Sequence, residues 1–237
     1  MRSIIQIFAL GYCLVSYAAD YSIDTISLQS DILIEQREYI RYLPSGTDIS
    51  DSVVTIYLLD GEFSNYRYET MEYVKYRYPV IGIGIQNVDR RRDLLPVNDA
   101  DKFLEFISME LIPLVEKDIR VEKRILYGHS FGGSFVLFAM LNNPGLFDKY
   151  IASSPTPIMD LIDSTLYFKL NIQLENNIKF FFSNGSKDMK QVKKWCERLH
   201  ENLLEINLDR IQWKYEVYEG ENHNTSDVIS LINGLTY

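Results

Sequence analysis

Residues 124–133 read RILYGHSFGG, and this stretch decides the fold. An apolar run that favours a β-strand comes first, a Gly-x-Ser-x-Gly motif follows, and residues 131–141 are apolar almost throughout, which predicts a buried helix. A serine at so sharp a strand-to-helix turn has a strained backbone, and Gly128 and Gly132 leave space where side chains would clash. The motif therefore predicts a nucleophile elbow that presents the Ser130 hydroxyl above a sheet, at a helix N-terminus.

Short apolar runs of the same kind recur on both sides of the elbow. They are predicted as strands at Val53–Leu59, Pro79–Ile85, Lys149–Ala152, Lys179–Ser183 and Trp213–Tyr218. Segments with helical spacing lie among them, at Ala100–Glu116, Lys190–Leu208 and Thr225–Leu235. An antiparallel hairpin is predicted ahead of them, from Tyr21–Gln29 and Ile32–Tyr42. The alternation predicts an α/β fold with a mainly parallel central sheet and helices on both faces.

A serine needs a neighbouring base to act as a nucleophile, and the chain has 3 histidines. His129 lies in the elbow itself, where its ring is expected to point away from the serine hydroxyl and to pack. His200 lies in a predicted helix between charged neighbours and is expected to be solvated. His223 lies in a polar loop between the last predicted strand and the last helix, as the base does in the chain order Ser, acid, His. His223 is therefore the predicted general base.

The third catalytic group should orient His223 and stabilise its charged form. Asp188 follows the strand Lys179–Ser183, at the place where the acid is expected, and is the predicted acid. Aspartate also caps helices, so capping of the next helix is an alternative role for Asp188. Glu219 and Glu221 are competing carboxylates, and a Ser–His pair without an acid is a further alternative.

Two backbone N–H groups are predicted to face the oxyanion of an acyl-transfer intermediate. The first belongs to Phe131, at the start of the helix after the elbow. The second belongs to Glu62, in the loop after the strand Val53–Leu59, where Gly61 is expected to let the backbone approach the substrate. An ordinary Asp-Gly turn is the alternative interpretation of this loop.

Composition limits the partners of the chain. Its 237 residues suit a single domain, and its formal net charge of −9 argues against nucleic acid or anionic lipid as a partner. No cluster of histidines and cysteines suggests a metal, and neither a metal nor an organic cofactor is expected. The sequence makes no prediction about the oligomeric state.

The N-terminus has the pattern of a secretory signal. Arg2 precedes an apolar run, and Ser16 and Ala18 stand where the −3 and −1 residues of a cleavage site would be. The pattern predicts a signal peptide of residues 1–18 and a mature domain of residues 19–237. That domain is expected to be exported, to the periplasm or outside the cell, without inserting into a membrane. A buried N-terminal strand or helix is the alternative.

Four stretches together resemble one family, the esterase D-like branch (putative esterases) of the α/β-hydrolases. They are Tyr57–Gly61, Gly84–Pro96, Gly128–Gly133 and Glu219–His223, in the order that the family has them. The branch includes enterochelin and other siderophore esterases, feruloyl and acetylxylan esterases, and mycolyltransferases. The resemblance extends from about residue 25 to the C-terminus. It implies the α/β-hydrolase fold and a serine esterase that acts on a small-molecule ester through an acyl-enzyme on Ser130, with His223 as base.

The same resemblance covers an arginine-aspartate-proline loop that contains Arg90 and Arg92. These two arginines are candidate substrate-binding residues, because arginines beside a cleft steer anionic substrates. Gly61 and His129, which lie next to the predicted oxyanion donor and nucleophile, are further candidates. The favoured alternative is that the arginines hold the shape of the loop by pairing with Asp89, Asp93 and Asp99. Only a short cap fits between Ser154 and Asn177, so the substrate pocket is expected to be shallow and open.

Two other functions remain open for this fold. An acyltransferase would use the same residues but accept a sugar or an alcohol in place of water. A non-catalytic binding relative would keep the fold without a working nucleophile, and the intact Ser130 and His223 count against that reading.

Overall fold

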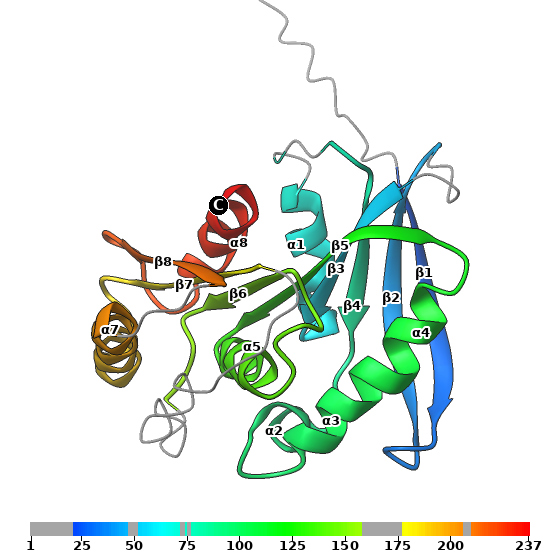
Figure 1. Cartoon of the computed structure of the whole chain (residues 1–237), viewed down its shortest axis with the longest axis horizontal. Coiled ribbons are helices and arrows are strands. Elements are labelled where there is room, and N and C mark those ends of the chain that lie inside the picture. Colours follow the sequence, from blue (N-terminus) through cyan, green and yellow to red (C-terminus); the bar gives the residue numbers. More distant parts are fainter. Residues whose placement is uncertain (1–20, 47–51, 72–73, 75–76, 158–176, 206–209) are drawn as a thin grey trace, which may run out of the picture.

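The computed structural model describes residues 21–46, 52–71, 74, 77–157, 177–205 and 210–237. Strands within these residues form one 8-stranded sheet with the order β1-β2-β4-β3-β5-β6-β7-β8 (Figure 1). Their bounds are β1 (Tyr21–Ser30), β2 (Glu35–Pro44), β3 (Ser52–Leu59), β4 (Val80–Ile85), β5 (Arg120–His129), β6 (Lys149–Ser153), β7 (Ile178–Gly185) and β8 (Ile211–Tyr218). The predicted signal peptide and most of the predicted cap lie outside the described residues.

The sheet is mainly parallel. All neighbouring strands from β4 through β3 and β5 to β8 are parallel, whereas β1 and β2 form an antiparallel hairpin and β2 is antiparallel to β4. In β3 every residue from 53 to 59 is buried, because helices cover this strand on both faces. The predicted architecture is thus confirmed, including the opening hairpin.

Helices cover the two faces of the sheet unequally (Figure 1). Their bounds are α1 (Ser64–Met71), α2 (Arg90–Leu94), α3 (Ala100–Phe106), α4 (Ile112–Val115), α5 (Phe131–Asn142), α7 (Lys190–Glu205) and α8 (Ser226–Thr236). Apolar side chains of α2, α3, α5 and α7 form one core against the sheet, with Phe103, Phe135 and Trp195 among them. The smaller core on the other face contains Tyr68 of α1 and Leu231 of α8.

Some elements differ from the prediction. Helices α1 and α2 were not expected from the sequence, and the segment Ala100–Glu116 contains a π-helical stretch at Ile107–Leu111 between α3 and α4. Helix α1 buries Arg67 together with Tyr68 and Met71, so its inward face carries a charge and lacks a clear apolar stripe. Five residues make up α2, too few for any helical period to be recognised.

Candidate active site

The elbow lies at the carboxyl end of β5, in the middle of the sheet. Ser130 has φ of 59° and ψ of −117°, a conformation that side chains rarely adopt, and α5 begins at the next residue. A Cβ atom on Gly128 would lie 2.3 Å from the carbonyl of Gly132, and one on Gly133 would lie 2.8 Å from the carbonyl oxygen of Ser153. Glycine is therefore required at position 128 so that the turn can close on itself. It is required at position 133 so that α5 can lie close to β6.

The predicted nucleophile, base and acid lie together. The Ser130 Oγ is 3.0 Å from Nε2 of His223, and Nδ1 of the same ring is 2.8 Å from Oδ1 of Asp188. Each comes from a loop at the carboxyl end of a strand, β5, β8 and β7 respectively. Because parallel strands end at the same edge of a sheet, residues up to 93 positions apart form one hydrogen-bonded chain.

Asp188 is held as a carboxylate in a closed environment. Its side chain has no exposed surface. Burial raises its pKa, but hydrogen bonds with His223 and from the Ser154 hydroxyl, at 2.6 Å, outweigh that effect and leave the pKa below its ordinary value. The Met189 N–H also donates to it, at 2.7 Å, so Asp188 bonds the first residues of the next segment as well as the imidazole. Among the described side chains, Asp188 is the only carboxylate with a hydrogen bond to His223; Glu219 and Glu221 have none.

The other two histidines lie outside this chain of hydrogen bonds. His129 is mostly buried, hydrogen-bonds Ser153 Oγ through Nδ1 at 3.0 Å, and packs 4.8 Å from the His223 ring. Burial lowers the pKa of His129 to about 4, so the ring is neutral at physiological pH. His200, which was expected to be solvated, is half-buried and packs its ring edge-on against Trp213 at 5.5 Å.

A 3₁₀ turn at Gly61–Phe63 follows β3 and brings Glu62 to the same edge of the sheet. The N–H groups of Glu62 and Phe131 each belong to a first helical turn, where backbone N–H groups have no partner inside the helix. A Cβ atom on Gly61 would lie 2.7 Å from the backbone of Ile85. Glycine at this position therefore allows the turn to pack closely on β4, a requirement that is not visible in the sequence.

Arg90 binds the residue that precedes the turn Gly61–Phe63. Its guanidinium makes two hydrogen bonds to the Asp60 carboxylate, at 2.6 and 2.8 Å, and lies over the Phe131 ring. Asp60 is buried with φ of 55°, and Asn87 donates to it at 2.8 Å. The expected partners Asp89, Asp93 and Asp99 were wrong for Arg90, because the sequence does not show that Asp60 is buried beside it.

Arg92 joins its loop to β2. It donates to Glu35 at 2.5 and 2.9 Å and to Asp93 at 2.7 and 2.9 Å. Asp93, one of its expected partners, also forms a buried ion pair with Arg37 at 2.8 Å. Asp89 instead caps α2, accepting from the N–H groups of residues 91 and 92. These contacts hold the loop's shape and leave neither Arg90 nor Arg92 without an acidic partner.

Sequence reasoning missed a buried cluster behind the histidines. Asp227, in the first turn of α8, accepts from Arg67 and from the hydroxyls of Tyr66 and Tyr127. Burial raises its pKa, but the Arg67 guanidinium, together with His129 and the two tyrosine hydroxyls, outweighs this effect and leaves the pKa below its ordinary value. The position of Asp227 in the first turn of a helix was visible in the sequence, but its partners are 100 or more residues away.

Two further properties apply to the part of the chain that the structure describes. Its acidic, histidine and cysteine side chains form no group of three or more suited to a metal ion. None of its helices combines the length and apolar character needed to span a bilayer.

The chain matches a known family over most of its length. The family model described as "Putative esterase" matches residues 30–226. Ferri-bacillibactin esterase BesA of Bacillus subtilis is 28% identical over 134 residues, which cover 52% of this chain and 46% of that protein. Siderophore triacetylfusarinine C esterase of Aspergillus fumigatus is 43% identical over 60 residues, covering 24% of this chain and 20% of that protein. These matches span less than half of each relative.

Solved structures share the fold over nearly the whole chain. An IroE-like serine hydrolase from Shewanella oneidensis has a TM-score of 0.81 at 23% identity, covering 90% of this chain and 79% of that one. The BES protein from Bacillus cereus has a TM-score of 0.78 at 24% identity and covers 99% of this chain and 98% of that one. With the match to the family model, these findings confirm the resemblance: the chain belongs to the putative-esterase family of the α/β-hydrolase superfamily.

Proposed function

We propose that the protein is a serine carboxylic ester hydrolase that acts through an acyl-enzyme on Ser130. The observation that carries the proposal is the chain of hydrogen bonds from Ser130 Oγ to His223 at 3.0 Å and from His223 to Asp188 at 2.8 Å. A serine hydroxyl becomes a strong nucleophile when a base within hydrogen-bonding reach accepts its proton. Membership in an esterase family supports the same reaction.

In the proposed reaction, Ser130 Oγ attacks the ester carbonyl while Nε2 of His223 takes its proton. The carbonyl oxygen becomes an oxyanion, which the N–H groups of Phe131 and Glu62 stabilise. His223 then gives the proton to the leaving alcohol, and the acyl-enzyme forms. A water molecule, deprotonated by the same nitrogen, attacks the acyl-enzyme and releases the acid and Ser130. Asp188 accepts from Nδ1 throughout and stabilises the imidazolium.

Siderophore esters are the class of substrate that we propose first. Two relatives with significant sequence similarity are described as siderophore esterases, of triacetylfusarinine C and of enterobactin, and a third as a ferri-bacillibactin esterase. Arg90 and Arg92 are satisfied by carboxylates, so neither is proposed as a direct contact for the substrate.

Ester hydrolysis by matched variants tests the proposal. Purified protein is assayed on p-nitrophenyl acyl esters of increasing chain length, then on siderophore, feruloyl and acetyl-sugar esters. We expect Ser130→Ala and His223→Ala each to lower kcat by at least about 10³-fold. Activity in wild type that survives in Ser130→Ala would assign the reaction to another residue. If added alcohols are acylated faster than water hydrolyses the acyl-enzyme, the protein is an acyltransferase.

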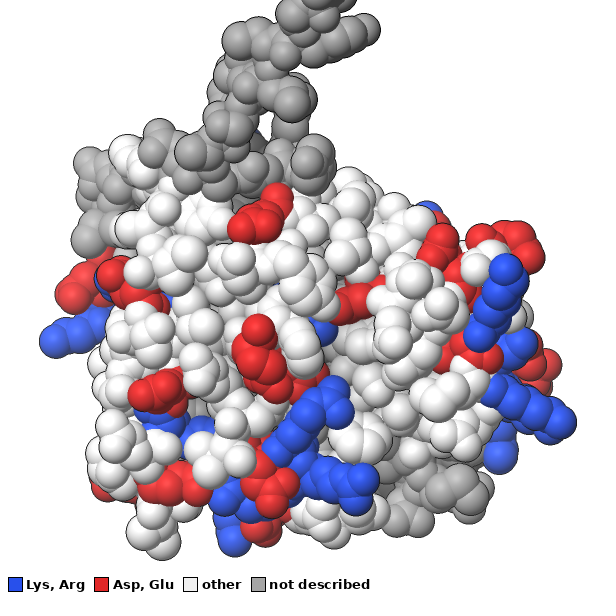
Figure 2. Space-filling view, turned by 180° about the vertical axis from the view of Figure 1, so that it is seen from behind, with Lys and Arg blue, Asp and Glu red and all other residues white. Residues whose placement is uncertain are grey.

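We also propose that the protein is exported. In addition, we propose that it does not bind nucleic acid, as its net charge of −9 suggests. The signal-like N-terminus supports export. On the face shown in Figure 2, acidic and basic side chains are interspersed, and no wide area of that face is basic alone. N-terminal sequencing of the protein from its native host tests export: the proposed mature protein starts at Ala19, and an intact Met1 in the cell extract contradicts it.

A further inference from the structure

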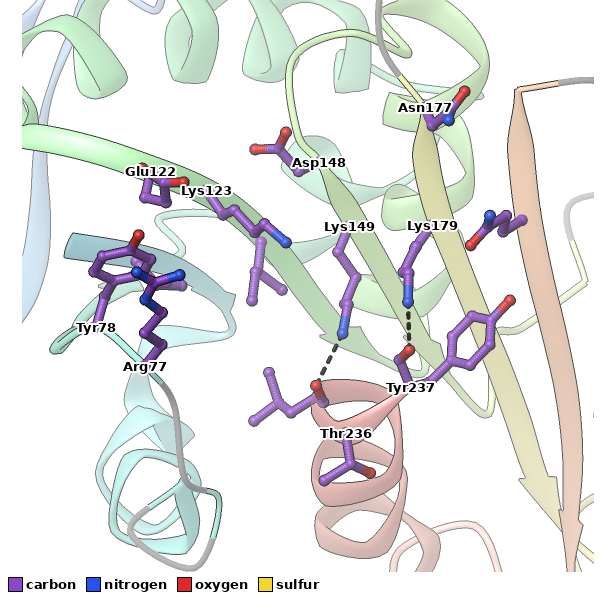
Figure 3. Close-up of a pocket in the computed structure, with 14 residues that line it drawn as sticks. Arg77, Tyr78, Glu122, Lys123, Asp148, Lys149, Asn177, Lys179, Thr236 and Tyr237 are labelled. Atoms are coloured by element: carbon purple, nitrogen blue, oxygen red, sulfur yellow. Dashed lines mark hydrogen bonds between the residues drawn. The ribbon is translucent and has the colours of Figure 1, made fainter. Parts of the chain in front are cut away.

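A cavity lies at the amino ends of the parallel strands, opposite the carboxyl ends that carry the proposed catalytic residues. It has a volume of about 650 Å³ and is lined by the first residues of β3, β5, β6, β7 and β8, by Arg77 and Tyr78, and by the end of α8 (Figure 3). Ser130, His223 and Asp188 are not among its lining residues. Cavities of 300 to 1,000 Å³ are typical of sites for small molecules.

Three lysines enter this cavity from neighbouring strands. Lys149 of β6 stands directly opposite Lys179 of β7. Lys123 lies on β5 two positions before Ile125, the partner of Lys149, so the alternation of side chains puts all three on the same face of the sheet. In Figure 3 the Lys149 and Lys179 side chains point toward the end of α8, and the Lys123 side chain points toward Lys149. Like charges on neighbouring strands destabilise a sheet unless something compensates them.

Contacts within the described residues compensate these charges only in part. Lys149 donates to the carbonyls of Gly234 and Leu235, at 3.0 and 2.9 Å, and Lys179 donates to the main-chain carboxylate of Tyr237 at 2.6 Å. These bonds stabilise the C-terminal end of α8. They leave one N–H of Lys149 and two of Lys179 available, since an ammonium has three. The exposed Lys123 ammonium has no ion pair with any described residue.

The electrostatic balance of the cavity is positive. Among the lining side chains, Arg77 joins the three lysines, whereas Glu122 and Asp148 are the carboxylates. Tyr237, the last residue of the sequence, adds a main-chain carboxylate, so four cations face three anions. Asp148 already accepts from the backbone N–H of Arg124 at 2.8 Å. Burial, Lys179 and Lys123 together lower the pKa of Lys149 to about 8. This concentration of positive charge occurs in a chain whose net charge is −9.

We propose that this cavity binds a small phosphorylated molecule whose phosphate groups carry two or more negative charges. Lysines bind phosphate as point charges, and three of them at a strand spacing of about 4.8 Å suit a multivalent anion. The volume exceeds what a single phosphate fills, and the rings of Tyr78 and Tyr237 also line it, which provides apolar surface for an organic part. The proposal does not depend on the ester chemistry at Ser130.

Isothermal titration calorimetry with inorganic pyrophosphate tests the proposal on the full chain. We expect wild type to bind pyrophosphate with a Kd of about 1 mM or tighter at low salt, and Lys123→Glu to bind it about tenfold more weakly. Lys194→Glu is the matched control, because Lys194 is exposed on α7, on the other side of the sheet, and the change of charge is the same. We expect it to bind as wild type does.

The two lysine variants are first compared with wild type by thermal unfolding, since both side chains are exposed and neither change should unfold the chain. Absence of binding by wild type at millimolar pyrophosphate overturns the proposal, as does equal weakening by Lys123→Glu and Lys194→Glu. Citrate is titrated in parallel. Binding of citrate without binding of pyrophosphate would overturn the assignment to phosphate.

Discussion

Ser154 positions Asp188, the acid of the proposed catalytic site. Its hydroxyl donates to Asp188 Oδ2 at 2.6 Å and also contacts Ser226 Oγ at 2.8 Å, while its own backbone has a φ of 43°. Because the single Ser154 hydrogen goes to Asp188, Ser226 donates to Ser154, and its hydroxyl oxygen also lies 3.2 Å from the carbonyl oxygen of His223. Ser154 thus orients the carboxylate that orients the base, without contacting the reacting atoms.

Ser154→Ala is expected to lower kcat about tenfold and to leave KM nearly unchanged, because a hydrogen bond to a buried charged group is lost. Ser183→Ala is the control, since Ser183 Oγ bonds Ser230 in the same buried layer at 2.6 Å and contacts no proposed catalytic side chain. Steady-state kinetics on a p-nitrophenyl ester measure both. Equal effects of the two changes would contradict a specific role for Ser154.

Asp188→Asn tests the identity of the acid. An amide removes the charge that stabilises the imidazolium and favours the wrong tautomer of His223, so kcat should fall by about 10³- to 10⁴-fold. Glu221→Gln, which changes a competing carboxylate, should retain wild-type kcat within about twofold. A larger loss in Glu221→Gln than in Asp188→Asn would move the acid to residue 221.

Two elements, the turn after β3 and helix α2, are joined by one ion pair. Arg90 of α2 compensates the Asp60 carboxylate, which is 2% exposed and precedes the turn that carries Glu62. The Arg90 side chain is 34% exposed, but its removal would leave the buried Asp60 carboxylate with a single described side-chain donor, Asn87. The position of the Glu62 N–H therefore depends on a helix that is itself distant in sequence.

Arg90→Met is expected to lower the free energy of unfolding by about 1 to 2 kcal/mol and to lower kcat as well. Arg91→Met is the control, because Arg91 is exposed in the same helix and its side chain has no ion pair among the described residues. Urea unfolding and steady-state kinetics measure both effects. If Arg90 instead bound an anionic substrate, the loss would be confined to KM for charged esters.

Helices and strands could be predicted from the sequence where the local hydrophobic pattern agrees with the burial of the side chains in the structure. Apolar runs predicted the strands of the parallel sheet, and the glycines around Ser130 predicted the turn, because both are local requirements. Helix α1 escaped prediction because Arg67 occupies its inward face, and its partner Asp227 is 160 residues away. The pair of Asp60 and Arg90 was missed for the same reason: burial of a charge is decided by tertiary contacts.

Across the whole molecule, Asp227 joins helices α1 and α8 to strand β5 beside the smaller core. It bonds Arg67 of α1 and Tyr127 of β5 from the first turn of α8. Its pKa in the folded protein lies below the ordinary value of 3.8. A carboxylate of this kind contributes stability above its unfolded pKa, and the contribution is lost as pH falls through the folded pKa.

Asp227→Asn should therefore destabilise the protein strongly at pH 7, and the difference from wild type should shrink as the pH falls below about 4. Urea unfolding from pH 7 to pH 3 measures the free energy of unfolding of both proteins. A difference that stays constant over this range would contradict a charge-based role for Asp227.

The central claim is that Ser130 is a nucleophile activated by His223, and a fluorophosphonate probe tests it most directly. Intact-protein mass spectrometry should show one adduct on wild type, located at Ser130 by peptide mapping, no adduct on Ser130→Ala, and a much slower reaction of His223→Ala. Equal labelling of wild type and Ser130→Ala, or no labelling of wild type, would contradict the claim.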